Sequence, residues 1–236
     1  MADSIFLQGK LEMSSSPVMV EEALPLWGEI LSNRLLVALS VLLFIFALKD
    51  IFKLTPSLVY MLQQKHGSQS LEYNISIARI RNFTALICIC PFCLIADKYA
   101  LYDAAFMADV SPMWRSCVHI GIFAAFLLLR RIIHSVIKVR RMHSDELASF
   151  SHSPYNYFIL TVFVMVASSL VMSFFNAGND FAHSVTMIEI ALFYFLSLIR
   201  SGQILRSYCG GLATILYLCG LEILPAAILI ASAVVF

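Results

Sequence analysis

The chain has 236 residues, of which 60% are hydrophobic and only 13% carry a charge. A soluble domain is about 45–50% apolar and about 25% charged, so this composition excludes an ordinary water-soluble fold and predicts a membrane protein. The net formal charge of +1 gives no reason to expect a nucleic-acid partner. Membrane lipids and other membrane proteins, including further copies of this chain, are the expected partners.

Residues 1–29 form an acidic segment without the basic start and apolar core of a secretory signal peptide. We therefore expect this segment to remain on the mature protein and to lie on the non-cytoplasmic side of the membrane. Trp27, close to the first apolar stretch, is expected to anchor the chain at the membrane interface.

Six apolar stretches approach the roughly 20 residues that a helix needs to cross a hydrocarbon core about 30 Å thick. They predict an all-α membrane bundle in one transmembrane domain, residues 30–236, with spans at about 30–51, 82–102, 112–133, 154–175, 181–200 and 211–234. Ser111-Pro112 and Ser153-Pro154 each place a capping hydroxyl before a proline that fits the first helical position. These pairs predict the starts of the third and fourth helices.

Lys and Arg residues are sorted along the chain, because 12 of the 16 follow the first, third or fifth predicted helix. Since basic residues in short loops stay cytoplasmic, we expect both termini on the non-cytoplasmic side. The longest cytoplasmic connection, 49–81, is the expected place for contact with a partner. A basic group after the third helix either retains that helix end in the cytoplasm, which is the favoured interpretation, or also contacts inner-leaflet lipids: Arg130, Arg131, Lys138, Arg140 and Arg141.

Glu189 and Glu222 lie well inside the fifth and sixth predicted helices. At about 1.5 Å per residue, Glu189 lies roughly 12 Å from the outer end of its helix and Glu222 roughly 15 Å from the inner end of its own. A carboxylate at the bilayer centre costs on the order of 2.5–3.5 kcal/mol or more, so it normally faces the bundle interior and has a partner. We therefore expect the two carboxyls at similar depth, and if the helix faces that carry them meet, they would share one proton.

Two interpretations of this carboxyl pair remain open. In the functional one, Glu189 and Glu222 form a site for a proton or a cation. In the structural one, they are neutral acids that hydrogen-bond between helices, to Tyr194, to Tyr217 or to a helix of a partner, because such bonds also serve assembly. The structural interpretation is the favoured one.

The segment from Cys88 to Cys93 invites a redox interpretation, because Cys-x-x-Cys can act as a thiol-exchange pair. Cys90 and Cys93 project about 60° apart on a helix, whereas Cys88 lies roughly 160° from Cys90. The thiols also lie mid-membrane, where thiolates are poorly stabilised. We therefore favour a packing role beside a kink at Pro91, and we expect Gly220 and Pro225 to mark close packing or a kink in the sixth helix.

No catalytic motif occurs in the sequence: it lacks His-Glu-x-x-His, Gly-x-Ser-x-Gly and a phosphate-cradling glycine loop. We accordingly predict no catalytic residue, no metal site and no cofactor, and expect a non-enzymatic protein.

The run from Tyr217 to Pro225 has the pattern Tyr-Leu-Cys-x-Leu-Glu-Ile-x-Pro. It resembles the ending of a domain-of-unknown-function family of inner-membrane proteins from Bacteroidota, and the likeness extends over roughly residues 35–236. The resemblance implies an address in the bacterial cytoplasmic (inner) membrane and supplies no activity.

Three functions are compatible with these features. The leading hypothesis is a subunit or assembly factor of a cell-envelope complex, which works by packing against other membrane helices. The second is a proton- or ion-coupled transporter of a small solute that uses Glu189 and Glu222. The third is a membrane thiol oxidoreductase that uses Cys90 and Cys93.

Overall fold

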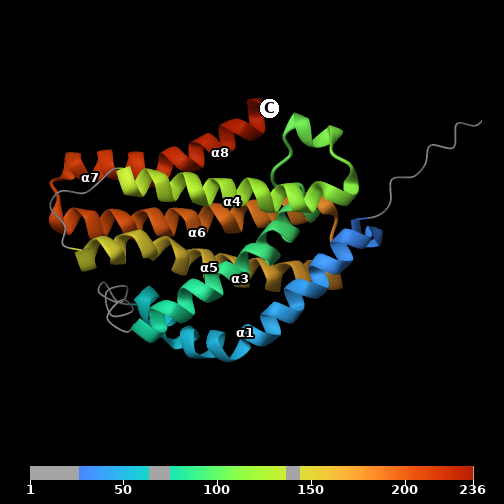
Figure 1. Cartoon of the computed structure of the whole chain (residues 1–236), viewed down its shortest axis with the longest axis horizontal. Coiled ribbons are helices and arrows are strands. Elements are labelled where there is room, and N and C mark those ends of the chain that lie inside the picture. The colour runs from blue at the N-terminus through green and yellow to red at the C-terminus, as the bar shows by residue number, and fades with distance from the viewer. Residues whose placement is uncertain (1–26, 64–74, 137–143, 236) are drawn as a thin grey trace, which may run out of the picture.

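The computed structural model of the chain describes residues 27–63, 75–136 and 144–235, and every regular element within these ranges is helical (Figure 1). The main helices are α1 (Leu31–Gln63), α3 (Ile75–Lys98), α4 (Pro112–Val136), α5 (Ser144–Phe174), α6 (Asn179–Tyr208), α7 (Gly211–Leu218) and α8 (Leu224–Val235). Three short elements accompany them: η1 (Trp27–Glu29), η2 (Ala105–Asp109) and η3 (Cys219–Ile223).

Six stretches are long and apolar enough to cross a membrane: Leu31–Pro56, Ile77–Lys98, Pro112–Val136, Ser153–Phe174, Asn179–Tyr208 and Gly211–Ala233. This confirms the predicted all-α, multi-pass class. α1, α5 and α6 have 33, 31 and 30 residues, so each runs beyond the length that a bilayer core requires.

The prolines define only one of the two predicted helix starts. α4 begins at Pro112, as expected, and the Trp114 N–H closes the first turn by donating to the Ser111 carbonyl over 2.9 Å. α5 begins earlier, at Ser144, and continues through Pro154. The apolar span of that helix still starts at Ser153, so the Ser-Pro pair marks the beginning of the apolar part and not of the helix.

α3 ends earlier than the sequence predicts, at Lys98, because the chain turns at Ala100 with a positive φ of 49°. The Leu101 N–H then donates to the Ala96 carbonyl over 2.9 Å, which satisfies a terminal carbonyl in the manner of a Schellman motif. Asn176 has the same φ of 49° after α5, where an Asn side chain tolerates the left-handed region better than Ala does.

α3 packs against α1, α4 and α5, while α6 packs against α5 and α7. Figure 1 places α1 at one edge and α7 and α8 at the opposite edge, where they lie against α4 and α6. The first described residues and the C-terminus lie at the same end of the bundle. We call this end the acidic end, since it carries Glu29, Asp97, Asp103 and Asp180; at the basic end, α6 finishes after Arg206.

The sixth span is not a continuous α-helix, because a π-helical turn, η3, separates α7 from α8. The Leu224 N–H donates to the Cys219 carbonyl, five residues back. Pro225 has no N–H and its ring clashes with the carbonyl four residues earlier, so a wider turn directly before it is the expected response. This irregular turn lies where the sequence placed Gly220 and Pro225 as packing or kink residues.

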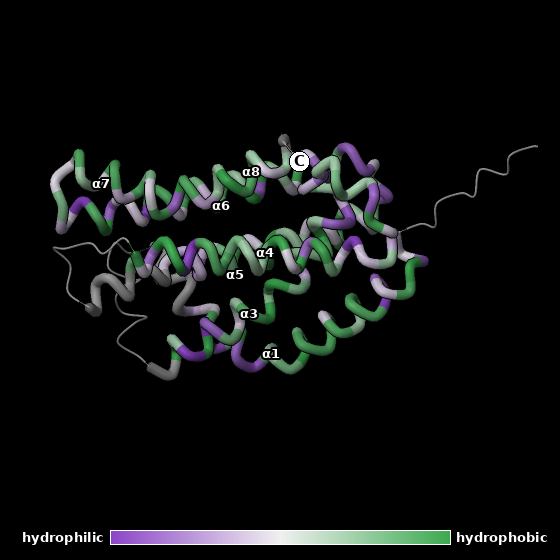
Figure 2. The backbone as a smooth tube through the Cα atoms, turned by 45° about the horizontal axis from the view of Figure 1, so that its top comes forward, coloured by the Kyte–Doolittle hydropathy of each residue, from purple (hydrophilic) through white to green (hydrophobic). Residues whose placement is uncertain are grey.

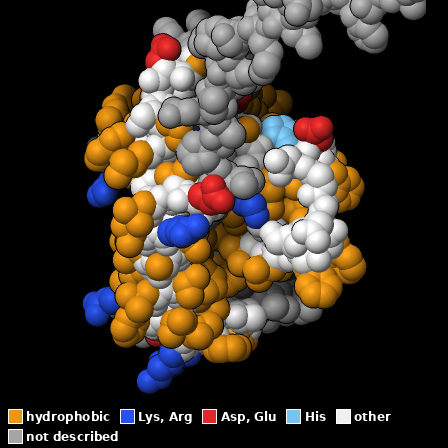
Figure 3. Space-filling model, turned by 90° about the vertical axis from the view of Figure 1, so that its right-hand side faces the viewer, with side chains coloured by type: hydrophobic (Ala, Val, Ile, Leu, Met, Phe, Trp, Pro, Cys, Tyr) orange, Lys and Arg blue, Asp and Glu red, His pale blue; other side chains and the backbone are white. Residues whose placement is uncertain are grey.

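The outer surface of the bundle is apolar and several polar side chains are inside. Phe46 is 74% exposed and Phe174 82%, whereas Asp97 is 8% and Glu222 7% exposed. Figure 2 shows hydrophobic residues along the length of the helices, and Figure 3 shows hydrophobic side chains over much of the flanks seen from the acidic end. A protein whose solvent is lipid has this arrangement, since each polar group must find its partner inside the protein.

Candidate functional site

Glu222 forms a buried ion pair with Arg130. Arg130 Nη2 donates to Glu222 Oε1 over 2.9 Å, and the two side chains are only 10% and 6% exposed. The bond joins α4 to η3 across 92 residues of sequence. A charge-assisted bond in a low-dielectric environment is strong only while both partners are present, because either charge alone would be buried without compensation.

His134 and Tyr155 complete the surroundings of this ion pair. His134 Nε2 lies 3.7 Å from the same carboxylate oxygen, Glu222 Oε1, and the ring packs beside Phe150. The Arg130 guanidinium lies over the Tyr155 ring, 5.7 Å from its centroid, in a cation–π contact. We refer to Arg130, His134 and Glu222 as the Glu222 triad.

The π-turn fixes the backbone as well as the side chain of Glu222. The Tyr194 hydroxyl on α6 donates to the Glu222 backbone carbonyl over 3.1 Å. Tyr194 thus contacts Glu222, as the structural interpretation expected, but through the main chain instead of the carboxyl. Tyr194 lies midway along α6 and Glu222 lies midway between the ends of the sixth span, Gly211–Ala233, whereas Arg130 and His134 lie in the last two turns of α4.

Glu189 lies elsewhere, and the prediction that the two carboxyls share a proton is wrong. Glu189 Oε2 accepts a hydrogen bond of 2.9 Å from the Ser168 hydroxyl on α5. An α-helix turns by about 100° per residue, so the five residues from Glu189 to Tyr194 rotate α6 by about 140°. The two carboxyls therefore lie on different sides of α6 and at different depths, which counting along the sequence could not reveal.

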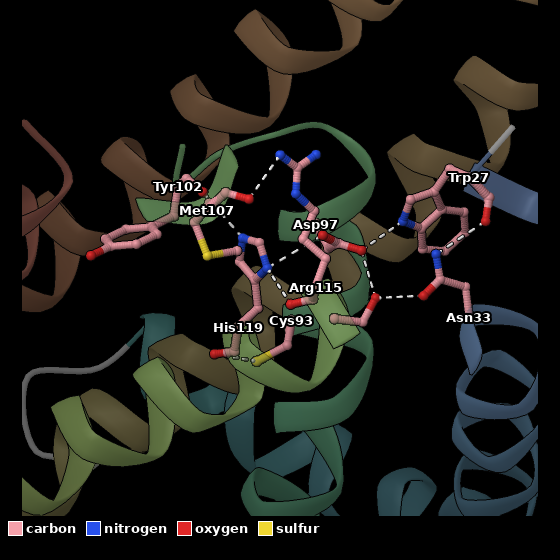
Figure 4. A network of polar contacts seen from close by, with 9 residues as sticks. Trp27, Asn33, Cys93, Asp97, Tyr102, Met107, Arg115 and His119 are labelled. Atoms are coloured by element: carbon pink, nitrogen blue, oxygen red, sulfur yellow. Dashed lines mark hydrogen bonds and ion pairs between the residues drawn. The ribbon is translucent and has the colours of Figure 1, made fainter. Parts of the chain in front are cut away.

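A second polar network holds the acidic end together, with Asp97 at its centre (Figure 4). The Trp27 indole N–H donates to Asp97 Oδ2 over 2.7 Å, and the Ser116 hydroxyl donates to the same oxygen. Asn33 extends the network, since its side-chain amide donates to the Trp27 carbonyl over 3.0 Å and its Oδ1 lies 2.7 Å from the Ser116 hydroxyl. η1, α1, α3 and α4 are thereby joined at one carboxylate.

His119 extends this Asp97 network toward the loop after α3. Its Nδ1 lies 3.3 Å from Asp97 Oδ1 and 3.0 Å from the Arg115 carbonyl, while Nε2 lies 3.2 Å from the Tyr102 carbonyl. The ring is 7% exposed, so its neighbours are protein atoms and not solvent. Figure 4 shows the ring between the chain at Tyr102 and Asp97.

Sequence reasoning missed the Asp97 network, although a signal for it was present. Asp97 lies at the end of an apolar helix, and Ser116 and His119 are three residues apart on the next helix, hence on one face. Asn33, two residues after the start of α1, is only 1% exposed. Polar residues clustered at one end of neighbouring apolar helices predict mutual contacts, even though no catalytic motif contains them.

Cys90 and Cys93 have separate partners on different helices. The Cys90 thiol lies 4.0 Å from the Leu36 carbonyl on α1, and the Cys93 thiol lies 3.9 Å from the His119 carbonyl on α4. Both cysteines are free. α3 continues through the neighbouring Pro91 as one helix, and these contacts fit the packing role.

The basic group after the third helix does not behave as one lipid-binding patch. Arg130 is 9% exposed and ion-paired with Glu222, so its expected contact with lipid headgroups is wrong. Arg131 is exposed, as that expectation requires. Lys138, Arg140 and Arg141 lie outside the described residues, as does part of the 49–81 connection, 64–74.

Fold and site together define a multi-pass membrane protein in which the buried carboxylates of Glu222 and Asp97 bind basic side chains of the same chain. In the described ranges, no group of three or more His, Cys, Asp or Glu residues could hold a metal ion. Comparison of this chain with protein-family models, with curated proteins and with solved structures finds no match. Its function must therefore be inferred from these polar contacts.

Proposed function

We propose that this protein is a non-enzymatic subunit or assembly factor of a cell-envelope complex in the bacterial inner membrane. The observation that carries the proposal is the Arg130–Glu222 ion pair, which is 2.9 Å long and buried. It ties the last span to α4 inside the apolar bundle, so its charges serve to hold helices in place.

The Asp97 network supports the same function at the acidic end of the bundle. Asp97, Ser116 and His119 are all buried and bind main-chain or side-chain groups from neighbouring elements. Fixed polar contacts inside the bundle and at its acidic end suit a rigid scaffold that presents its outer helix faces to other proteins. A transporter, by contrast, must exchange the ligands of its carboxylates during each cycle.

The membrane and the orientation belong to the proposal as well. The inner-membrane address rests on the resemblance of the segment from Tyr217 to Pro225 to the Bacteroidota family. The distribution of basic residues supports a non-cytoplasmic location for both termini. Labelling of a cysteine placed at Lys98, at the acidic end, with a membrane-impermeant reagent in intact cells tests this orientation, since a cytoplasmic Lys98 would remain unlabelled.

The proposed function is tested by purification of the tagged chain from its native membrane in mild detergent, followed by mass spectrometry. A complex subunit should retain envelope proteins in fixed stoichiometry through size exclusion. Recovery of the chain alone, as a monomer or homo-oligomer, would contradict the proposal.

One observation favours a second candidate, a proton-coupled transporter. The Glu222 triad places a histidine 3.7 Å from a carboxylate that is carried by a π-turn, and such turns occur frequently at functional sites. If this candidate is correct, Glu222→Gln should abolish proton-coupled flux in proteoliposomes while the variant still folds. Glu189→Gln is the matched control, because Glu189 does not contact the triad.

A further inference from the structure

We infer that Glu189 marks the contact site for a transmembrane helix of a partner protein that carries a basic side chain at the same depth. This inference rests on the proposed function and assigns that function a place on the molecule. Glu189 is ten residues along α6 from Asn179, or about 15 Å, so it lies well inside the apolar span Asn179–Tyr208.

Glu189 has a weaker set of contacts than the other intramembrane carboxyl. Within the described ranges, its one hydrogen-bond partner is the Ser168 hydroxyl at 2.9 Å, and it has no ion pair there. Ser168 also lies 3.1 Å from the Met165 carbonyl, so its single hydroxyl hydrogen is within reach of two acceptors. Glu222, in contrast, has a guanidinium at 2.9 Å.

The Glu189 side chain is also half-buried, whereas Glu222 is 7% exposed. It lies at the lipid-facing seam between α5 and α6, which we define by four exposed residues that flank Ser168 and Glu189 on the two helices. Their exposed fractions are 37% for Val164, 55% for Val171, 54% for Leu192 and 40% for Leu196. A carboxyl with apolar neighbours on both sides is open to an approaching helix and not to water.

The chemistry of the seam favours a basic partner over a second copy of this chain. A carboxyl in hydrocarbon is costly unless it binds a cation or a hydrogen-bond donor. Arg130 is buried against Glu222, and the side chains of Arg81 and Arg200 are buried as well. A second copy that met this seam with its own seam would bring another Glu189 and Ser168, and the exposed residues that define the seam include no basic side chain.

The test uses the full chain in phosphatidylcholine vesicles and two synthetic transmembrane helices of about 24 leucines and alanines. One helix has a lysine at its centre and the other a leucine, and fluorescence transfer to a dye on the C-terminus of the chain reports association. The lysine helix should associate about three- to fifteen-fold more tightly, the range that intramembrane hydrogen bonds provide. Glu189→Leu should remove this preference.

Asp180→Asn is the matched control, because it removes one carboxylate from the same helix at the exposed acidic end and should keep the preference. Equal association of the two helices with the wild-type chain would overturn the inference, as would an unchanged preference in Glu189→Leu. The inference would also be overturned if the chain self-associates and Glu189→Leu abolishes this self-association, because a second copy would then occupy the seam. Binding of the lysine helix without any partner in the native purification would instead contradict the proposed function alone.

Discussion

Glu222 and Glu189 are carboxyls on neighbouring spans, yet their surroundings differ in almost every respect. Glu222 is buried, meets Arg130 at 2.9 Å and lies on a π-turn whose carbonyl is held by Tyr194. Glu189 is half-buried, meets one serine and borders the lipid. An acidic residue in an apolar span can therefore have one of two roles. Paired with a cation of the same chain, it stabilises the fold; without such a cation, it can bind another protein.

Removal of one member of the ion pair should have the largest effect on stability. Arg130→Met leaves Glu222 buried without its cation, and we expect a loss of about 3–5 kcal/mol in the free energy of unfolding. Thermal or denaturant unfolding in detergent measures it. Arg131→Met, at the exposed neighbouring position, is the matched control.

The double variant Arg130→Met/Glu222→Met sharpens this prediction. It removes both charges, so it should recover much of the stability that Arg130→Met loses. Additive losses in the double variant would show that the two side chains do not act as a pair.

Truncation of Asp97 should cost less, about 1–3 kcal/mol, since it leaves hydrogen-bond donors unpaired without removing a full ion pair with an arginine. In Asp97→Ala, the indole of Trp27 also loses its acceptor. Its fluorescence, measured in a Trp114→Phe background, should therefore change together with stability. Asp103→Ala removes an exposed acid nearby and should change neither quantity.

Ala100 gives a smaller effect with the opposite sign. Its φ of 49° is unfavourable for a residue with a Cβ, so Ala100→Gly should stabilise the protein by about 0.5–1 kcal/mol in unfolding experiments. Ala104, in the same loop, has a φ of −80°. Ala104→Gly should be destabilising, and stabilisation by both substitutions would refute strain at Ala100 as the cause.

Glu189→Leu should have the smallest effect on the isolated chain, within about 0.5 kcal/mol of wild type, as for surface substitutions elsewhere. The reason is that this substitution breaks one bond to Ser168 and leaves no buried charge behind. A loss as large as that of Arg130→Met would mean that Glu189 is as deeply involved in the fold as Glu222, and the contrast between them would disappear.

The sequence predicted the Glu222 triad only in part, and the Asp97 network was not predicted. Glu222 was recognised as an intramembrane acid and Gly220 and Pro225 as a point of irregular packing, because composition and proline chemistry are visible along the chain. The partner of Glu222 was not recognised, because Arg130 is 92 residues away. Arg130 also lies in a group of basic residues that the sequence assigned to the cytoplasmic end of a helix.

By itself, the amino-acid sequence determined the class of the protein and its six spans, because the thickness of a bilayer sets a length that apolar runs either reach or do not. Only the tertiary structure decided which charged groups meet. The rotation of α6 separates Glu189 from Glu222, and the packing of the last span on α4 brings Glu222 to Arg130. Such pairings depend on helix rotation and relative height, and neither quantity is encoded in a single apolar run.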